Sequence, residues 1–171
     1  MKLDIDGNIE WQNEYYAWYM DYTLSVQQTS DGGYVFVCDS GEYVTEGFGQ
    51  VFKNEVAVIK LAPSGGFESN AIAIRVVNPG DYPQCYQLTS DGGCIIAGNI
   101  IPSESLGGDI WVSKLDQSGE IEWGRIYGGF DYDLSHSIQN TSEGGYILAG
   151  STHSFGAGNR DIWILKLDQS G

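Results

Sequence analysis

The stretch TSDGGCIIAGNI at residues 89–100 decides the fold, because the chain contains two similar copies of it. The copies are TSDGGYVFVCDS at 29–40 and TSEGGYILAGST at 141–152. A second phrase follows each of the three along the chain: NEVAVIKLAPSGGFES at 54–69, GDIWVSKLDQSGEIEW at 108–123 and RDIWILKLDQSG at 160–171. Repetition of this kind indicates an array of similar structural units that pack on one another.

The repeats divide the chain into three units of approximately 12–69, 70–123 and 124–171. Unit 2 contains four short apolar stretches separated by Gly-containing turns, a pattern typical of β-strands: 84–88, 94–100, 109–116 and 120–126. Four-stranded units at a period near 50 residues are typical of propellers. The sequence therefore predicts an all-β fold, a β-propeller with three four-stranded blades, with a β-solenoid or a prism as the alternative.

The two ends of the chain carry halves of the same phrase. KLDIDGNIEW at 2–11 resembles the end of the second phrase, and KLDQSG at 166–171 stops before it is complete. We expect 2–11 to supply a fourth strand for the last unit or for a preceding blade. Since a propeller closes with about 4–8 blades, the ring is expected to be partial or completed by an oligomer. We therefore expect either self-association or further blades from a longer chain. The duplicated half-phrase favours the longer chain.

Composition and charge restrict the function. The chain has 171 residues, 42% of them apolar, and a formal net charge of −15. A surface with this much negative charge repels phosphate backbones and anionic lipids. This repulsion argues against binding to nucleic acids and to membrane surfaces. The longest aliphatic runs are too short to span a bilayer, and the N-terminus MKLDIDG carries no apolar core of a signal peptide.

Three cysteines give no metal or disulfide pattern. Cys38, Cys85 and Cys94 are not at ligand spacing from either His136 or His153. Cys85 and Cys94 fall on adjacent predicted strands about three residues out of register, too far for a disulfide. We therefore predict free cysteines, no metal and no cofactor.

A family resemblance rests on the segments YQLTSDGGCIIAGNI (86–100) and SIQNTSEGGYILAGSTHSFGAGNRDIWILKLDQSG (137–171). They resemble a β-propeller repeat of secreted and cell-surface proteins of bacteria and archaea, and the likeness extends over nearly the whole chain. The resemblance implies a propeller fold and an extracellular or cell-surface location. It implies no reaction.

The lysine of the second phrase recurs at the end of a predicted strand. A three-residue turn at 117–119, with Gly119 in the left-handed conformation, places Lys114 opposite Glu122. The same register pairs Lys60 with Glu68 and Lys2 with Glu10. We interpret these lysines as structural partners of cross-strand acids.

Two sets of acids also recur, and each has two interpretations. Asp21, Asp81 and Asp133 each precede a turn threonine by eight residues, and Glu55, Asp109 and Asp161 each open a predicted third strand. They could form a ring of carboxylates that binds a cation or a sugar, or they could satisfy backbone donors within their own units. The second interpretation is favoured, because an active site normally breaks the repeat.

The loop DIDGN at 4–8 has the alternate oxygen ligands of a calcium loop. It lacks the distal glutamate, since Tyr15 stands at the twelfth position counted from Asp4. We interpret it as a hairpin turn.

Aromatic residues provide the candidate binding site. EYYAWYM at 14–20 falls between predicted units, and the connection from Cys38 to Glu55 is longer than its counterparts in units 2 and 3. Exposed rings beside acids suit a sugar face or a protein partner, whereas buried rings would cover the end of a sheet. The candidate residues are Tyr15, Tyr16, Trp18, Tyr19, Tyr43, Phe48 and Phe52.

No catalytic residues are predicted. Hydrolysis of a glycoside needs two carboxylates at a defined separation, and the 23 acids offer no basis for choosing a pair. His136 has serines on both sides, but neighbours in a strand point to opposite faces. The first expectation is a non-enzymatic extracellular binding or scaffold module for a glycan or a protein. The alternatives are a polysaccharide-active enzyme and an incomplete segment of a larger propeller protein.

Overall fold

The computed structural model describes residues 1–15, 19–46, 49–67, 72–74, 82–100 and 107–171. For 19–24, 39–46, 49–56 and 72–74 it describes the backbone alone. All regular structure within these ranges is β-strand. The predicted all-β class is therefore confirmed.

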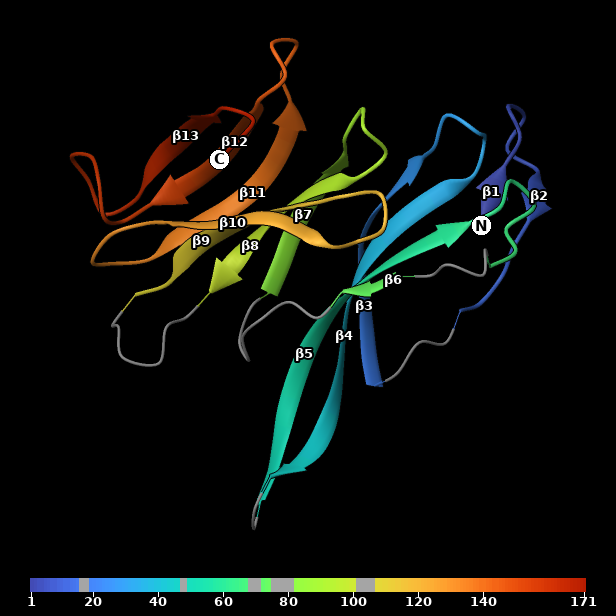
Figure 1. Cartoon of the computed structure of the whole chain (residues 1–171), viewed down its shortest axis with the longest axis horizontal. Coiled ribbons are helices and arrows are strands. Elements are labelled where there is room, and N and C mark those ends of the chain that lie inside the picture. Colours follow the sequence, from blue (N-terminus) through green and yellow to red (C-terminus); the bar gives the residue numbers. More distant parts are fainter. Residues whose placement is uncertain (16–18, 47–48, 68–71, 75–81, 101–106) are drawn as a thin grey trace.

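The strands form four antiparallel sheets (Figure 1). The N-terminal hairpin pairs β1 (Lys2–Leu3) with β2 (Ile9–Trp11). Sheet 1 contains β3 (Tyr19–Gln28), β4 (Tyr34–Glu46), β5 (Gly49–Leu61) and β6 (Ile72–Ile74). Sheet 2 contains β7 (Tyr82–Leu88), β8 (Cys94–Ile100), β9 (Asp109–Leu115) and β10 (Ile121–Tyr127). Sheet 3 contains β11 (Asp133–Asn140), β12 (Tyr146–Thr152) and β13 (Asp161–Leu167).

The prediction of three four-stranded units is met in two of them. Sheets 1 and 2 each have four strands in consecutive order, whereas sheet 3 has three in the part of the chain that the structure describes. β2 belongs to the segment expected to supply a fourth strand for the last unit or for a preceding blade, and it pairs with β1. It does so because the turn at 4–8 folds Lys2 and Leu3 directly back onto it.

Recurring tight turns explain why the strands begin and end at these residues. In the TSDGG phrase the amide of Thr29 donates to the carbonyl of Gly33, and the same bond recurs from Thr89 to Gly93 and from Thr141 to Gly145. The KLDQSG turn closes with Gly119 at φ +84°, as predicted from the left-handed preference of glycine.

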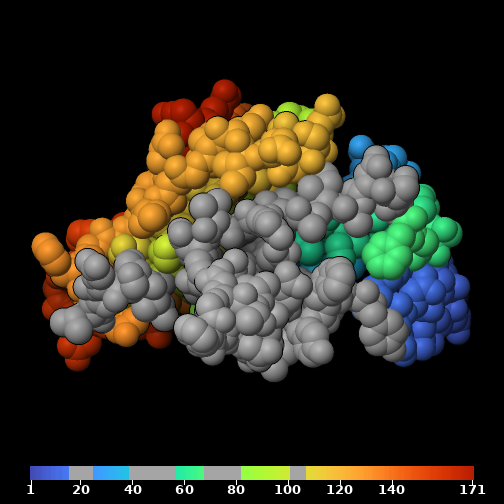
Figure 2. Space-filling view, turned by 60° about the horizontal axis from the view of Figure 1, so that its bottom comes forward, coloured from blue at the N-terminus to red at the C-terminus, as the bar shows by residue number. Residues whose placement is uncertain are grey.

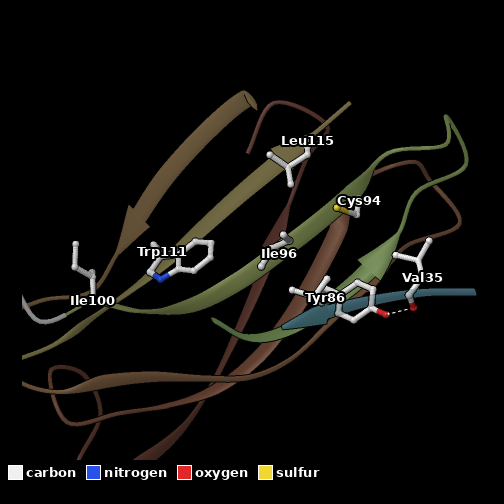
Figure 3. Close-up of a cluster of buried hydrophobic side chains, with 8 residues drawn as sticks. Val35, Tyr86, Cys94, Ile96, Ile100, Trp111 and Leu115 are labelled. Carbon is white, nitrogen blue, oxygen red and sulfur yellow. Dashed lines mark hydrogen bonds between the residues drawn. The ribbon is translucent and has the colours of Figure 1, made fainter. Parts of the chain in front are cut away.

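The sheets stack face to face, and each interface contains one apolar core. Val35 and Val37 of sheet 1 pack with Tyr86, Ile96 and other side chains of sheet 2. Figure 3 shows this core, in which the hydroxyl of Tyr86 donates to the carbonyl of Val35 across the interface at 2.7 Å. The opposite face of sheet 2 packs on sheet 3 through a core of Ile95, Ala97, Ile110, Val112, Ile138, Tyr146, Leu148 and Leu167.

The N-terminal hairpin lies against the remaining face of sheet 1. Trp11 and Tyr15 pack on a core formed by Phe36, Cys38, Ala57, Ile59 and Leu61. The order in space is therefore hairpin, sheet 1, sheet 2 and sheet 3, so the N- and C-terminal segments lie at opposite ends of the molecule (Figure 2). The first strands of consecutive sheets are neighbours, since β7 contacts both β3 and β11.

No helix among the described residues is both long and apolar enough to cross a membrane.

Candidate binding surface

The recurring lysines pair with acids in the turns of their own sheets. Lys60 lies 2.8 Å from Asp31, Lys114 lies 2.8 Å from Asp91, and Lys166 lies 2.5 Å from Glu143. Each acid belongs to the first turn of the sheet and each lysine to its third strand. These partners differ from the cross-strand acids that the sequence predicts. The signal is the acid that stands in every copy of the TSDGG turn, beside the strand that carries the lysine.

The predicted partners in the fourth strand are also present where the structure describes them. Lys114 lies 3.0 Å from Glu122, and Lys2 pairs with Glu10. The predicted register is wrong at this point, because a bulge at Glu122 places Trp123 opposite Lys114. Glu68 lies outside the described residues.

Lys114 is the buried member of this set, with only 3% of its side chain exposed. Burial opposes its charge, but hydrogen bonds to Asp91 and Glu122 outweigh that cost and raise the pKa of Lys114. In return, Lys114 and then Thr89 lower the pKa of Asp91 to about 2. These charges neutralise one another and hold the sheet together.

Two tryptophans each connect one unit to a turn of the following unit. The indole of Trp11 donates to the carbonyl of Pro63 at 3.2 Å, and that of Trp123 donates to the carbonyl of Gln169 at 2.9 Å. Each ring lies over a glycine with positive φ, Gly65 and Gly171, where an added Cβ would come within 2.8 Å and 2.7 Å of the ring. This contact fixes where consecutive units meet.

Among the three recurring acids before the turn threonines, only the carboxylate of Asp133 is described. It is fully buried at the start of β11, where Oδ2 accepts hydrogen bonds from the amide of Gly129 and the hydroxyl of Ser154. This supports the structural interpretation for Asp133. The side chain of Asp21 and the whole of Asp81 lie outside the described residues.

The acids that open the third strand behave differently from one another. Burial, and then the charge of Asp133, raise the pKa of Asp109. Asp161 accepts a hydrogen bond from the amide of Gly158, within the loop before β13. The side chain of Glu55 lies outside the described residues.

The loop at 4–8 is a hairpin turn, as predicted. The carboxylate of Asp4 accepts hydrogen bonds from the amides of Asp6 and Asn8 and from the side chain of Asn8. These bonds are the local backbone contacts of a turn. The described residues contain no group of three or more His, Cys, Asp or Glu side chains that could hold a metal ion.

Cys38, Cys85 and Cys94 are not joined in disulfides. Cys85 is opposite Ala97 in the β7–β8 register, three residues from Cys94, as the sequence predicted. Burial raises the pKa of both Cys85 and Cys94 to about 12. Neither sulfur is a reactive nucleophile at neutral pH.

Tyr15 is the one predicted binding residue whose side chain is described. Its ring packs against Phe36 and Phe67 with centroids 5.9 Å and 4.9 Å away, and its hydroxyl donates to the carbonyl of Gly65 at 2.5 Å. Tyr15 therefore covers the end of sheet 1. Only the backbone is described for three of the others, Tyr19, Tyr43 and Phe52, while Tyr16, Trp18 and Phe48 lie outside the described residues.

The β4–β5 hairpin is the largest departure of unit 1 from the others. Both strands have 13 residues, whereas the equivalent β8 and β9 have 7. The pairing of β3 with β4 reaches only Gly41, but the β4–β5 ladder continues to Glu46 and Gly49. This two-stranded extension of residues 42–53 projects from the body of the molecule (Figure 1) and contains the register pair Tyr43 and Phe52.

A cavity of about 410 Å³ lies on the face of sheet 1 beside the N-terminal hairpin. Its walls are mainly apolar and aromatic, with Trp11, Val26, Tyr34, Phe36, Ile59 and Leu61 among them.

Unit 3 contains a serine–histidine contact. His136 Nε2 lies 3.3 Å from the hydroxyl of Ser151 and 3.4 Å from the guanidinium of Arg160. The neighbouring serines considered in the sequence are not its partners. The second partner of the imidazole is therefore a guanidinium, whereas a carboxylate orients the histidine of a hydrolytic triad.

Comparison with known families finds no family that matches this chain. A search of curated proteins also finds no match.

Proposed function

We propose that the chain forms an arc of a β-propeller and serves as a non-enzymatic binding or scaffold module in the extracellular space or at the cell surface. Support for the arc comes from consecutive sheets that stack through apolar cores with their first strands adjacent. The location rests on the resemblance of the repeats to those of secreted and cell-surface proteins.

The projecting β4–β5 hairpin is the observation that carries the binding role. Residues 42–53 pair only with one another within the described ladders, so they add little to the stack of sheets. Among the described strands, those of unit 1 alone have this extension. Functional residues concentrate on segments that a rigid scaffold projects, and Tyr43 and Phe52 supply aromatic rings suited to a sugar face or a protein partner.

The roles of the described recurring charges support a non-enzymatic module. Asp31, Asp91 and Glu143 bind lysines in their own sheets. Asp4, Asp116 and Asp168 accept hydrogen bonds within their own turns. Such repeated acids stabilise the fold in every unit, so they are not available as a catalytic pair.

A panel of glycans tests this proposal and separates it from a polysaccharide-active enzyme. We expect binding without release of reducing sugar, and we expect it to be lost in the double variant Tyr43→Ala with Phe52→Ala. A second variant, Tyr16→Ala with Trp18→Ala, tests the neighbouring aromatic segment. Phe130→Ala is the control, because Phe130 is fully exposed in another unit. Release of reducing sugar would favour the enzyme, and unchanged binding in both double variants would contradict the proposed surface.

A further inference from the structure

Sheets 1 and 2 each bury apolar side chains on both faces, whereas sheet 3 has apolar side chains exposed on one face. In sheet 2, Ile95, Ile110 and Val112 face sheet 3 and are fully buried. The residues at the same positions of sheet 3 are Ile147, Ile162 and Ile164, which are 41%, 86% and 55% exposed. We call these three residues the C-terminal face. Three large aliphatic side chains that have buried counterparts one unit earlier mark an interaction surface.

The recurring lysine shows the same difference. Lys114, at the interface between sheets 2 and 3, has 3% of its side chain exposed, whereas Lys166 of sheet 3 has 63%. The two residues have equivalent partners in the first turn of their sheets, Asp91 and Glu143. Their exposure differs because sheet 3 is the last in the stack.

The opposite end of the molecule has the matching surface. Sheet 2 receives Val35 and Val37 on a face that includes Cys94, Ile96 and Leu115. The residues at these positions of sheet 1 are Tyr34, Phe36 and Leu61, and all three line the 410 Å³ cavity beside the N-terminal hairpin. Phe36 and Leu61 are already buried where Trp11 and Tyr15 pack on them, so Tyr34 is the more accessible of the three. Val26, which is 61% exposed, lies at this cavity as well. We call these four residues the N-terminal face.

We propose that a second copy of this chain docks head to tail, with the C-terminal face of one copy on the N-terminal face of the other. The contact would continue the interface that already joins sheet 1 to sheet 2 and sheet 2 to sheet 3. Two copies contribute six main sheets, which is within the range of about 4–8 blades that closes a propeller. A head-to-tail contact whose rotation closes gives a ring, so the expected product is a dimer.

The open edge of β13 has a candidate neighbour in the same contact. In sheet 2, β10 pairs with β9 so that Trp123 is opposite Lys114, and β2 pairs with β1 so that Trp11 is opposite Lys2. The two registers share the same bulge. The β2 strand of the second copy can therefore pair with Lys166 and Leu167 once it releases the two-residue β1.

The proposal rests on the propeller arc proposed above, but not on the β4–β5 hairpin or on any ligand. Loss of glycan binding and loss of association are thus separate results. Since each copy carries a formal charge of −15, association should be measured at about 0.5 M salt, where exposed charges are screened within several ångströms.

Sedimentation of the unchanged 171-residue chain, of three single variants and of a mixture of two of them tests the inference. We expect a dimer for the unchanged chain at about 50 μM, and association weakened on the order of 100-fold in Ile162→Asp and in Val26→Asp. Ile126→Asp is the control, because Ile126 is 58% exposed on β10 and outside both faces. Its dimer should persist. Circular dichroism of each variant confirms that the sheets remain folded.

Mixing the two defective variants distinguishes head-to-tail from face-to-face contact. Ile162→Asp retains the N-terminal face and Val26→Asp retains the C-terminal face, so the mixture should form a heterodimer through one intact interface. A dimer of Val26→Asp alone, or no heterodimer in the mixture, would overturn the head-to-tail arrangement. A monomer of the unchanged chain would overturn the second copy as occupant, in favour of a repeat unit of a longer polypeptide.

Discussion

Single glycines set the distance between consecutive units. Gly7 and Gly65 occupy the same position of equivalent turns, with φ of +85° and +80°. A Cβ at Gly7 would meet nothing within 4 Å, whereas one at Gly65 would lie 2.8 Å from the ring of Trp11. The two positions therefore separate backbone strain from loss of the tryptophan contact.

We expect Gly65→Ala to destabilise the protein more than Gly7→Ala does. Both variants incur the left-handed penalty of about 1–2 kcal/mol, and Gly65→Ala also displaces Trp11 at a further cost of roughly 1–3 kcal/mol. Urea unfolding monitored by circular dichroism measures the difference. Equal free energies of unfolding for the two variants would show that the tryptophan contact contributes nothing.

The buried lysine allows a second comparison at equivalent positions. Lys114→Met should lower the free energy of unfolding by about 1–3 kcal/mol, because it removes a nearly buried ammonium and leaves two carboxylates and a carbonyl without that partner. Lys166→Met should cost less than about 1 kcal/mol, since exposed ion pairs contribute little. Similar losses in the two variants would contradict the assigned roles.

The same pair predicts a dependence on pH. The pKa of Asp91 falls from 3.8 to about 2 on folding. Its stabilising contribution is therefore complete above about pH 4 and disappears as the pH falls through 2. The stability difference between the unchanged chain and Lys114→Met should shrink in this window. A difference that stays constant from pH 7 to pH 2 would exclude Asp91 as the partner that matters.

At the scale of elements, the β4–β5 extension is separate from the stack of sheets. Its ladder from Glu42 with Lys53 to Glu46 with Gly49 has no third strand within the described pairings. The last pair that β3 supports is Gly41, which is opposite Asn54. A two-residue turn can therefore join these two residues directly.

Replacing residues 42–53 with Asn-Gly should leave the sheets intact. We expect a melting temperature within about 2–4 °C of the unchanged chain, the shift that follows from roughly 1 kcal/mol in a chain of this length. Glycan or protein binding should be lost in the same variant. Cooperative unfolding that disappears on this replacement would mean that the extension is part of the core and would contradict its role as a recognition element.

The elements were more predictable than the contacts between them. The four strands of unit 2 agree with the sequence prediction to within two residues at each end. Their turns carry local signals in Gly, Asp and Thr, which act through neighbouring backbone groups. The bulge at Glu122 shifts the register within the β9–β10 hairpin, and the ion pair of Lys114 with Asp91 joins the third strand to the first turn of the sheet. A rule for one turn could place neither of them.

The candidate site was less predictable for a similar reason. The sequence leaves Tyr15 either as an exposed binding residue or as a ring that covers the end of a sheet. In the structure its ring packs against Phe36 and its hydroxyl donates to the carbonyl of Gly65. Whether a ring is buried depends on which unit packs beside it. The unusual length of the connection after Cys38 did indicate the projecting hairpin, because insertions relative to a repeat are visible in the sequence itself.

At the scale of the whole molecule, the proposed propeller arc depends on sheets that stack in chain order through opposite faces. Val37 and Ile96 share the core between sheets 1 and 2, while Ile110 and Leu148 share the core between sheets 2 and 3. These pairs join different units, so they report on the stack and not on any single sheet.

Methyl–methyl nuclear Overhauser contacts in the chain with labelled Ile, Leu and Val methyl groups test this claim most directly. The stacked arrangement predicts contacts between Val37 and Ile96 and between Ile110 and Leu148, each across one interface. An intact pattern of strand pairing without either contact would contradict the stack of sheets on which the proposed propeller arc rests.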